Sequence, residues 1–480
     1  MDIVKITTNV ENFRNDIADE IRAFNHNTRE YKNDDEYYNF NVILEEKDNL
    51  IVTIKTDILG SFVEDKYTYD LCNSQDKIER KSYNKFAVKI STYKTLQKQY
   101  NISLPYGSLT GIRPTKLFRK YDNLGKNARE IFINKYLVSE EKTNLISDIV
   151  ELQKPYLNKS ENMVDIFVNI PFCPSRCSYC SFVSTDISKQ RKYVADYIKC
   201  LQNEISIIKK LVLDNNYSVR AVYIGGGTPS SLEVNELESI VKLLNFNQLE
   251  FTVEVGRPDT ISKELLDMLQ KYVVTRISIN PQTFNQQTLD RIGRRHTVDE
   301  IYKAYELARN YNFLINMDLI ALLPGESYED FLHSVKETIK LNPDNITVHT
   351  LSLKKGSKLN ESNYDNNEGE LASKMVDISK KLVTEAGYKA YYMYRQKNMS
   401  GNLENTGYEK NNTSCIYNID IMEENTSIMA CGAGAISKRL YLNEDRLERL
   451  ANMKNAKEYI ERFDDNIKKT VEFWQIDNKN

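Results

Sequence analysis

The sequence predicts an α/β protein whose central part is a partial (β/α)6 barrel, flanked by an N-terminal α+β accessory domain and a C-terminal helical region. From about residue 164 the chain alternates between short β-rich runs and helical stretches, and alternating βα units build a parallel sheet. Six units are too few for a closed eight-stranded barrel, which leaves a partial barrel or an open doubly wound sheet. We favour the partial barrel.

The length of 480 residues predicts two or three domains. We place an accessory domain at residues 1–160, the barrel core at 161–360, and a domain that covers the substrate at 361–480. In the accessory domain, "FNVILEEKDNLIVTIKT" contains two strand-like runs around Asp48-Asn49, which predicts a hairpin. The stretch "YGSLTGIRPTKLFRKY" predicts a Gly/Pro-punctuated loop that leads into a helix.

The barrel prediction depends on six apolar runs separated by helical stretches. The predicted strands are residues 165–170, 220–225, 251–256, 275–280, 315–322 and 345–351. After the first of them, one apolar stripe with helical spacing predicts a helix that covers the sheet. The stripe consists of Tyr193, Tyr197, Leu201, Ile205 and Ile208. Beyond residue 360 the pattern predicts a long polar helix over 367–386 and a charged helical tail.

The composition is that of an ordinary globular protein, with 41% hydrophobic and 28% charged residues. The net charge of −3 gives no global basic field, so we expect no nucleic-acid partner. No window approaches 18 apolar residues and the first residues lack signal-peptide features, so we expect a cytoplasmic protein without a membrane span. Three of the seven cysteines cluster, which favours a metal site over a disulfide framework.

The clustered cysteines are Cys173, Cys177 and Cys180, which directly follow the first predicted strand of the barrel. Ligands of parallel α/β folds bind at this end of the strands. Zinc fits poorly because no fourth cysteine or histidine follows at finger spacing. A redox CxxC at 177–180 and a coincidence of three buried cysteines are weaker interpretations. The interpretation that remains is a [4Fe–4S] cluster that is held by three thiolates and leaves one iron open.

Polar residues recur where the later predicted strands end. "GGGTPS" (225–230) lets the backbone approach a ligand closely, because glycine has no side chain. Glu254 and Asp318 lie in otherwise apolar strands, and a buried carboxylate requires a partner. Gln282 and Arg294 follow the fourth strand. We expect these groups to converge on one site, although each alone is more typical of a surface or capping residue.

The spacing Cys173-x3-Cys177-x2-Cys180, with Tyr179 before the last cysteine, resembles the radical S-adenosylmethionine (radical SAM) superfamily. The resemblance implies that the amino and carboxylate groups of SAM occupy the open iron. It also implies that "GGGTPS" is the glycine motif of that superfamily.

A closer resemblance is to the oxygen-independent coproporphyrinogen III oxidases (coproporphyrinogen dehydrogenases) and their heme-chaperone relatives. It covers roughly residues 164 to 440. The phrases that carry it are "VNIPFCPSRCSYCSF", "IGGGTPS", "FTVEVGRPD", "RISINPQTFNQQTLDRIGRRHT", "MDLIALLPGES" and "CGAGAISK". The phrases "GSLTGIRPTKL" and "YYMYRQKNMSGNLEN" resemble the longer branch of the family, which has an additional N-terminal domain.

Carried over to this chain, the resemblance implies that Cys173, Cys177 and Cys180 ligate the cluster. It further implies a set of contacts to SAM. These are Phe167, Tyr179, Gly225, Gly226, Gly227, Thr228, Glu254, Gln282, Arg294 and Asp318, with Ser352 and Ile436 in looser alignment.

The implied reaction is the oxidative decarboxylation of coproporphyrinogen III to protoporphyrinogen IX in heme biosynthesis. A SAM-derived radical would take a hydrogen from a propionate, and carbon dioxide and one electron would then leave. The implied partners are the tetrapyrrole substrate and an electron donor such as flavodoxin or ferredoxin. The rival functions are a heme chaperone without decarboxylase activity, or a radical SAM methyltransferase that opens heme.

The chain departs from the family pattern at three positions. Phe167 stands where the family usually has tyrosine, and Asn169 where it often has histidine. Phe182 replaces an extra cysteine of the oxidase branch, and the heme chaperones share that absence. For the four propionates of the substrate, arginine forks are suitable partners. The candidates are Arg113, Arg295 and Arg395, and the alternative for Arg113 and Arg395 is a structural salt bridge between chain regions.

Overall fold

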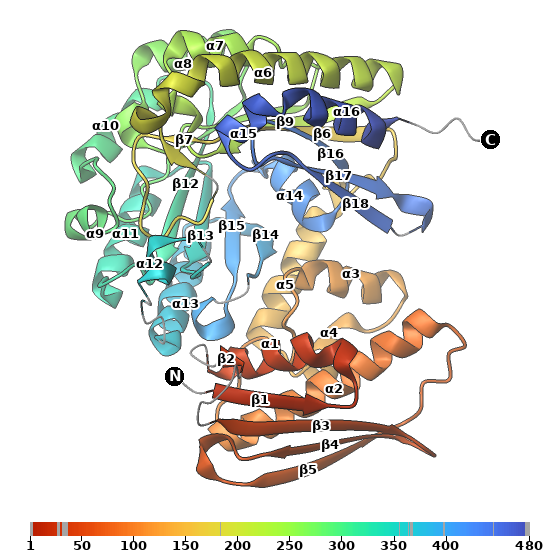
Figure 1. Cartoon of the computed structure of the whole chain (residues 1–480). Coiled ribbons are helices and arrows are strands. Elements are labelled where there is room, and N and C mark those ends of the chain that lie inside the picture. The colour runs from red at the N-terminus through yellow and green to blue at the C-terminus, as the bar shows by residue number, and fades with distance from the viewer. Residues whose placement is uncertain are drawn as a thin grey trace. The chain divides into compact units, whose positions relative to one another are not determined.

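The computed structural model describes residues 3–25, 29–30, 37–182, 184–354, 356–362, 364, 368–396, 399–444 and 446–475. The chain splits into two compact units, coloured by residue number in Figure 1. Unit 1 consists of Met1–Val150, Asn363–Ser373 and Tyr394–Glu404, and unit 2 contains the rest of the chain. The three-domain division with bounds at 160 and 360 stays a prediction.

Unit 1 is built on a five-stranded sheet in the order β2-β1-β3-β4-β5. The strands are β1 (Ile3–Thr8), β2 (Arg29–Glu30), β3 (Tyr38–Glu46), β4 (Leu50–Thr56) and β5 (Val63–Tyr69). The predicted hairpin is confirmed, since β3 and β4 pair antiparallel around a turn in which Lys47 N–H donates to Asn49 O. Alternate residues of β4 are buried, as expected for a strand with one covered face.

Two helices, α1 (Arg14–Phe24) and α2 (Lys77–Tyr100), lie along one face of this sheet (Figure 1). Their apolar side chains and the buried residues of β1, β3 and β4 form one hydrophobic core, in which the rings of Phe24 and Tyr93 lie 5.3 Å apart. Further helices follow in α3 (Pro114–Asn123), α4 (Ala128–Glu130) and α5 (Glu140–Gln153). The helix predicted after the Gly/Pro loop is α3, which begins at Pro114 because proline fits the first turn.

Unit 2 contains the predicted barrel core, and the fold class is confirmed. Six parallel strands lie in the order β13-β12-β11-β10-β9-β6, the reverse of their order in the chain. They are β6 (Met163–Ile170), β9 (Ser218–Gly226), β10 (Glu250–Glu254), β11 (Arg276–Ser278), β12 (Leu314–Ala321) and β13 (Asn345–Thr350). Each overlaps one of the six predicted runs.

Helices cover the outer side of these strands (Figure 1). They are α6 (Ile187–Asp214), α7 (Val234–Val241), α8 (Lys263–Lys271), α9 (Gln286–Arg291), α10 (Val298–Ala308) and α11 (Tyr328–Leu341). The predicted apolar stripe lies on α6, where Tyr197, Leu201, Ile205 and Ile208 are buried and Tyr193 is half-buried. Strands and covering helices therefore alternate along the chain, as the sequence pattern predicts.

The C-terminal region carries the expected helices, including α13 (Gly369–Glu385) for the predicted polar helix, but it also contributes strands. The other helices are α12 (Lys358–Glu361), α14 (Ile416–Glu423), α15 (Ala456–Glu461) and α16 (Phe463–Trp474). The strands are β14 (Lys389–Tyr394), β15 (Asn405–Glu409), β16 (Ser427–Cys431), β17 (Ile436–Tyr441) and β18 (Arg446–Ala451). They extend the sheet to eleven strands, with β14 and β15 beyond β13 and the other three beyond β6.

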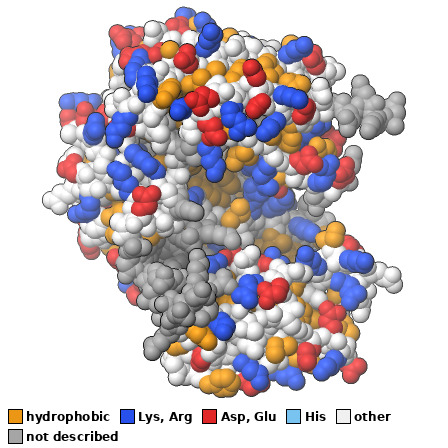
Figure 2. Space-filling model, in the orientation of Figure 1, with side chains coloured by type: hydrophobic (Ala, Val, Ile, Leu, Met, Phe, Trp, Pro, Cys, Tyr) orange, Lys and Arg blue, Asp and Glu red, His pale blue; other side chains and the backbone are white. Residues whose placement is uncertain are grey.

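The face of the molecule drawn in Figure 2 carries basic and acidic side chains interspersed on both units. This mixture matches the small net charge of −3. Among the residues that the structure describes, no helix is long and apolar enough to cross a membrane.

Candidate functional site

The three clustered cysteines lie in the loop that follows the first barrel strand. Cys173 is in the short strand β7 (Phe172–Cys173), which pairs in parallel with β8 (Thr185–Asp186). Cys173 and Cys177 are each 8% exposed, whereas Cys180 is only half-buried. The cysteine loop, residues 171–182 and 184 of the described chain, therefore keeps Cys173 and Cys177 covered and leaves Cys180 partly accessible as a residue.

Hydrogen bonds to two other loops fix the cysteine loop. Ser178 N–H donates to Ile292 O (2.9 Å), and the Ser175 hydroxyl donates to Gly293 O (3.0 Å). From helix α12, which follows β13, Leu359 N–H donates to Ser178 O (3.0 Å). The loop is thus held by the segments that follow β11 and β13 as well as by its own strand, β6.

The thiols lie close enough to interact electrostatically. Burial raises the pKa of Cys173, and it raises that of Cys180 to about 11; in both, the negative charge of Cys177 adds to the rise. Within the part of the chain that is described, no three histidine, cysteine or carboxylate side chains are placed to ligate a single metal ion. A four-iron cluster binds each thiolate through a different iron and does not need that arrangement.

The glycine motif packs directly against the cysteine loop. Gly227 N–H donates to Ile170 O (2.8 Å), Thr228 N–H donates to Phe172 O (2.7 Å), and the Thr228 hydroxyl lies 3.6 Å from Cys173 Sγ. A Cβ atom at Gly227 would lie 2.5 Å from Phe172 O and 3.0 Å from Cys173 Sγ. Gly226 has a φ of 111°, which L-residues rarely adopt. Only glycine therefore permits this approach.

Glu254 is the last residue of β10 and points along the inner face of the barrel. Its Oε1 accepts from the Tyr223 hydroxyl at 2.5 Å, and a Cβ atom at Gly225 would lie 2.9 Å from its Oε2. Burial raises the pKa of Glu254 to about 7, and the nearby Asp318 carboxylate adds to the rise; the Tyr223 hydroxyl and Gly226 N–H act in the opposite direction. A cation bound here would restore the charged form.

Asp318 lies on the inner face of β12 and is already partnered. Its Oδ1 accepts from the Asn316 amide (2.8 Å), and its Oδ2 lies 3.7 Å from His349 Nε2 on β13. Burial would raise the pKa of Asp318, but the His349 imidazole and the Asn316 and Thr347 side chains outweigh burial and lower it. Asp318 is therefore ionised at neutral pH, whereas Glu254, with a pKa of about 7, is only partly ionised there.

Gln282 is buried and has an unusual backbone conformation. Its φ of 68° lies in the left-handed region, and it is held there because its N–H donates to Asp318 O and its carbonyl accepts from Ile320 N–H. The Gln282 Oε1 atom is buried and has no hydrogen-bond partner among the described residues. Buried polar atoms are normally paired, so this amide oxygen is a group with which a bound ligand could pair.

Arg294 and Tyr179 lie beside the thiols. The Arg294 guanidinium is 6% exposed, donates to Asn280 O, and interacts with Tyr179 and Cys177. Burial would lower the pKa of Arg294, but the neighbouring Tyr179 and Cys177 raise it above its usual value. Arg294 thus carries a fixed positive charge next to the thiols.

Three of the predicted contacts are placed less tightly. Phe167 stacks on Tyr417 of α14 at 6.1 Å between ring centroids and lies 6.3 Å from Tyr223, its partner in the register of β6 and β9. Ser352 follows β13 and is half-buried. Ile436 begins β17 and is 46% exposed. Their roles as contacts stay predictions.

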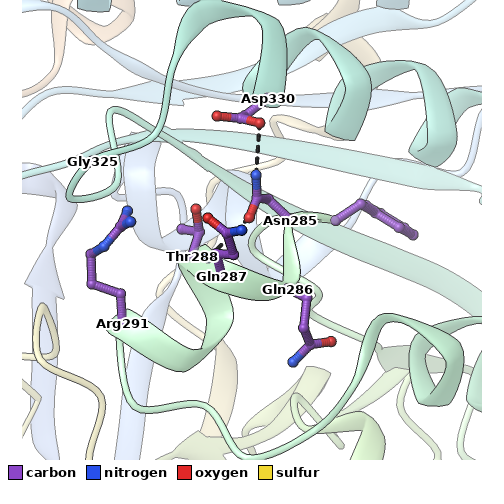
Figure 3. A pocket seen from close by; sticks show the side chains of 8 residues that line it. Asn285, Gln286, Gln287, Thr288, Arg291, Gly325 and Asp330 are labelled. Atoms are coloured by element: carbon purple, nitrogen blue, oxygen red, sulfur yellow. Dashed lines mark hydrogen bonds between the residues drawn. The ribbon is translucent and has the colours of Figure 1, made fainter.

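A separate cavity of about 450 Å³ adjoins the loop that carries Gln282 (Figure 3). Its lining includes Asn285 and Asp330, which hydrogen-bond to each other at 2.7 Å, and Arg291, which donates to Pro324 O beside Gly325. These groups link the starts of α9 and α11. The cavity is therefore lined by residues whose hydrogen bonds hold the segment that follows Gln282.

Two residues of the site were missed by the sequence analysis. Tyr223 donates to Glu254 and stacks on Tyr417, with ring centroids 4.5 Å apart. His349 faces Asp318. Both stand at alternate positions of runs that were predicted as strands, so the period-two pattern could have placed them on the inner face beside Glu254 and Asp318.

The three arginines that were predicted to bind the substrate differ in their exposure and in their hydrogen bonds. Within unit 1, the Arg395 guanidinium donates to the carbonyls of Leu109 and Asn402 and lies 4.1 Å from the Tyr106 ring. This arrangement favours the structural alternative for Arg395. Arg113 precedes α3 and is half-buried, and Arg295 is exposed.

The residues present fit a cluster and SAM. Three thiols lie within electrostatic reach of one another, the glycine motif leaves space that any Cβ would fill, and the buried Gln282 Oε1 lacks a partner among the described residues. Cys173, Cys177 and Cys180 would hold the cluster. Glu254, Gln282 and Asp318 line the adjoining inner face and would hold SAM.

Comparisons with known proteins identify relatives of this chain. Residues 168–338 match the Radical SAM superfamily. The chain is 39% identical over 430 residues to the oxygen-independent coproporphyrinogen-III oxidase-like protein HemZ of Bacillus subtilis, covering 86% of this chain and 85% of HemZ. It is 32% identical over 196 residues to the heme chaperone HemW of the same species, covering 39% and 50%. Coproporphyrinogen III oxidase (HemN) from Escherichia coli shares the fold, with a TM-score of 0.52, 21% identity, and coverage of 66% and 73%.

Proposed function

Since this chain belongs to the oxygen-independent coproporphyrinogen-III oxidase-like family of radical SAM proteins, we propose that it decarboxylates coproporphyrinogen III to protoporphyrinogen IX. Radical SAM proteins use a [4Fe–4S] cluster and SAM. When bound, these cofactors supply one-electron chemistry that removes a hydrogen atom from an unactivated carbon. The observation that carries the proposal is the packing of the glycine motif against the cysteine loop, where the Thr228 hydroxyl lies 3.6 Å from Cys173 Sγ and a Cβ atom at Gly227 would lie 3.0 Å from it.

In this proposal the cysteine loop and the inner face of the barrel have different tasks. Cys173, Cys177 and Cys180 bind the cluster, and the fixed charge of Arg294 offsets the thiolate charge beside it. Glu254 and Asp318 orient SAM from the inner face of the sheet. Because Glu254 has a pKa of about 7, the cationic part of SAM would favour its ionised form. The barrel wall holds the reacting groups in place and excludes water.

The test is anaerobic reconstitution of the full chain with iron and sulfide, followed by reaction with SAM, a strong reductant and coproporphyrinogen III. Mass analysis of the tetrapyrrole should show the loss of two carboxyl groups per molecule, with SAM consumed. Cleavage of SAM without any loss of carboxyl groups would refute decarboxylation.

The second candidate is a heme chaperone, and one residue of the site favours it. Phe182, which replaces the extra cysteine of the oxidase branch, is 67% exposed at the edge of the cysteine loop. The similarity to HemW supports the same function. Tight heme binding together with four retained carboxylates on coproporphyrinogen III would establish this second function.

A further inference from the structure

Tyr223 and Glu254 are brought together by the register of two barrel strands. Tyr223 of β9 pairs with Thr252 of β10, and Glu254 lies two residues further along β10. Alternate residues of a strand face the same side, so Tyr223 and Glu254 are diagonal neighbours on one face of the sheet. Aromatic side chains can reach such a neighbour. The Tyr223 hydroxyl accordingly donates to Glu254 Oε1 at 2.5 Å.

Gly225, the first residue of the glycine motif, leaves room for both side chains. A Cβ atom at Gly225 would lie 2.9 Å from Glu254 Oε2 and 2.9 Å from Tyr223 Cε1. A side chain at this position would therefore displace one or both of them. Tyr223 thus binds one oxygen of the carboxylate, and the other oxygen lies over the glycine motif.

The Tyr223 ring is held by two other aromatic rings. Tyr417 of α14 stacks on it, with the ring centroids 4.5 Å apart and the ring planes 25° apart. Phe167 is the register partner of Tyr223 on β6, on the side of β9 away from β10, and its ring lies 6.3 Å from that of Tyr223. Stacked aromatic pairs of this kind stabilise one orientation of the ring. The rings of Tyr417 and Phe167 thus direct the Tyr223 hydroxyl at Glu254.

Several groups act on the charge of the Glu254 carboxylate. Burial raises the pKa of Glu254 to about 7, and the Asp318 carboxylate on β12 adds to the rise. The Tyr223 hydroxyl is the strongest of the groups that lower this pKa, ahead of Gly226 N–H and the His349 imidazole on β13. Loss of the Tyr223 hydroxyl would therefore raise the pKa of Glu254 further.

We propose that Tyr223 is a positioning residue of the SAM site and acts through Glu254. Its hydroxyl fixes the carboxylate above the glycine motif and favours the charged form, which can pair with the cationic part of SAM. The inference rests on the proposed binding of SAM at Glu254. It predicts that removal of the hydroxyl changes SAM binding only through Glu254, and mainly near neutral pH.

The experiment measures equilibrium binding of SAM between pH 6 and pH 9 to the full chain with its cluster reconstituted. Tyr223→Phe removes the hydroxyl and keeps the ring. Loss of one hydrogen bond to a charged group should raise the pH of half-maximal SAM affinity by about one unit. If the protonated form binds SAM about tenfold more weakly, the shift gives about a threefold loss near pH 7 and less than about a 1.5-fold loss at pH 9. Titration of SAM itself is common to both proteins, so it cancels at each pH.

The matched control is Tyr302→Phe. The Tyr302 hydroxyl also donates to a carboxylate at 2.5 Å, that of Glu337, but this bond joins the covering helices α10 and α11. Tyr302→Phe should bind SAM as wild type does at every pH. Iron content should be that of wild type in both variants, and a loss of iron in Tyr223→Phe would overturn the inference.

A double variant tests whether Tyr223 acts through Glu254. Tyr223→Phe/Glu254→Gln should bind SAM as Glu254→Gln does, because the carboxylate on which the hydroxyl acts is gone. A further loss in the double variant would overturn the inference, as would a loss in Tyr223→Phe that persists at pH 9, or equal affinity of Tyr223→Phe and wild type at pH 7.

Two further outcomes separate this inference from the proposed function. If Glu254→Gln binds SAM as wild type does, Glu254 is not part of the SAM site and the inference is wrong. If the predicted pH shift is found but coproporphyrinogen III keeps its carboxylates, the proposed reaction is refuted and Tyr223 remains a positioning residue for SAM.

Discussion

The two ends of the barrel use the same kinds of polar residue for different purposes, and strand β10 shows both within five residues. Glu250 begins β10, and its carboxylate accepts from Arg276 (3.3 Å) and from the N–H groups of Ile416 and Tyr417. Glu254 ends the same strand and accepts from Tyr223. At the amino end a buried carboxylate meets a fixed cation, whereas at the carboxyl end it does not.

The polar groups that neighbour Glu250 and Glu254 can be compared in the same way. At the amino end, Arg276 also donates to Asn345 and to Thr413 O, and Asp165 accepts from Thr426. At the carboxyl end, the Gln282 Oε1 atom has no partner within the described chain. Unpaired buried atoms occur at both ends, because Arg276 Nε and the Ser414 hydroxyl also lack partners among the described residues. The two ends therefore differ in whether the buried carboxylate of β10 has an ion-pair partner, which Glu250 finds in Arg276.

The largest expected effect comes from removing a thiol at the carboxyl end. Cys173→Ala should abolish the cluster. Three thiolates leave one of the four irons without a protein ligand, and the loss of Cys173 would leave a second iron without one. Iron analysis and visible absorbance after anaerobic reconstitution measure this. The matched control is Cys415→Ala, a buried thiol 3.2 Å from Glu250 at the amino end, which should keep about four irons per chain as wild type does. Full iron content in Cys173→Ala would refute the ligand assignment.

Breaking the amino end should cost stability. Arg276→Met leaves the Glu250 carboxylate buried without its cation, and removal of one partner of a buried ion pair costs about 3–5 kcal/mol. Denaturant unfolding of the apo protein measures the change. In Arg276→Met/Glu250→Gln part of the loss should be recovered, because no unpaired charge remains although Asn345 and the Thr413 carbonyl still lack their donor. If Arg276→Met is as stable as wild type, the Arg276–Glu250 ion pair does not stabilise the amino end of the barrel.

The carboxyl end should make stability depend on pH. The pKa of Glu254 is raised from 4.5 to about 7, so the folded apo protein holds a proton that the unfolded chain releases. Stability from this proton is fully present below pH 4.5 and is lost as the pH rises to about 7, a change of about 3 kcal/mol at most. Glu20 and Glu326, with pKa values of about 8, act in the same direction.

The comparison of wild type with Glu254→Gln isolates the contribution of Glu254. Unfolding free energies at pH 5 and pH 7.5 should differ less in this variant than in wild type. An identical pH difference in both proteins would show that Glu254 is not the titrating group.

The same substitution should weaken SAM binding by about tenfold, or about 1.4 kcal/mol, because the glutamine cannot pair with a cation. Equilibrium binding of SAM to the reconstituted protein measures this, with iron content as the check on the cluster. Glu250→Gln is the matched control and should reduce stability while leaving SAM affinity unchanged. Equal SAM affinity in wild type and Glu254→Gln would remove Glu254 from the SAM site.

The smallest expected effect is at Phe182. Phe182→Cys and Phe182→Ala should change the rate of vinyl product formation by less than about twofold, because placement of the propionate near the radical source depends on the pocket. The rate is measured anaerobically with coproporphyrinogen III. A gain of decarboxylation that appears only in Phe182→Cys would show that the thiol is required.

Much of the barrel was predictable because its signals are local. Each of the six parallel strands is an apolar run followed by a helical pattern, and the cysteine spacing lies within eight residues of the sequence. The strands after residue 388 were not predicted. β16 pairs with β6, about 260 residues away in the chain, and its own run is too short to reveal that partner.

The sequence predicted which residue types face the candidate site, but not their ionisation or their hydrogen-bond partners. The positions of Glu254 and Asp318 within apolar strands indicated inward-facing carboxylates. Sequence could not show that His349 keeps Asp318 ionised, or that Tyr223 is the partner of Glu254, because both contacts cross between strands. The left-handed backbone of Gln282 is likewise imposed by its bonds to β12 and not by its residue type.

The pairing of β16 with β6 has a consequence for how the protein is made. β6 emerges from the ribosome about 260 residues before Cys431, the end of its second partner strand. At translation rates of 5–20 residues per second, one edge of β6 waits roughly 13–50 s for that partner. The cysteine loop directly follows β6, so during this interval the nascent chain exposes three free thiols beside an open strand edge. Iron delivery and chaperone protection would be most useful to the cell within that interval.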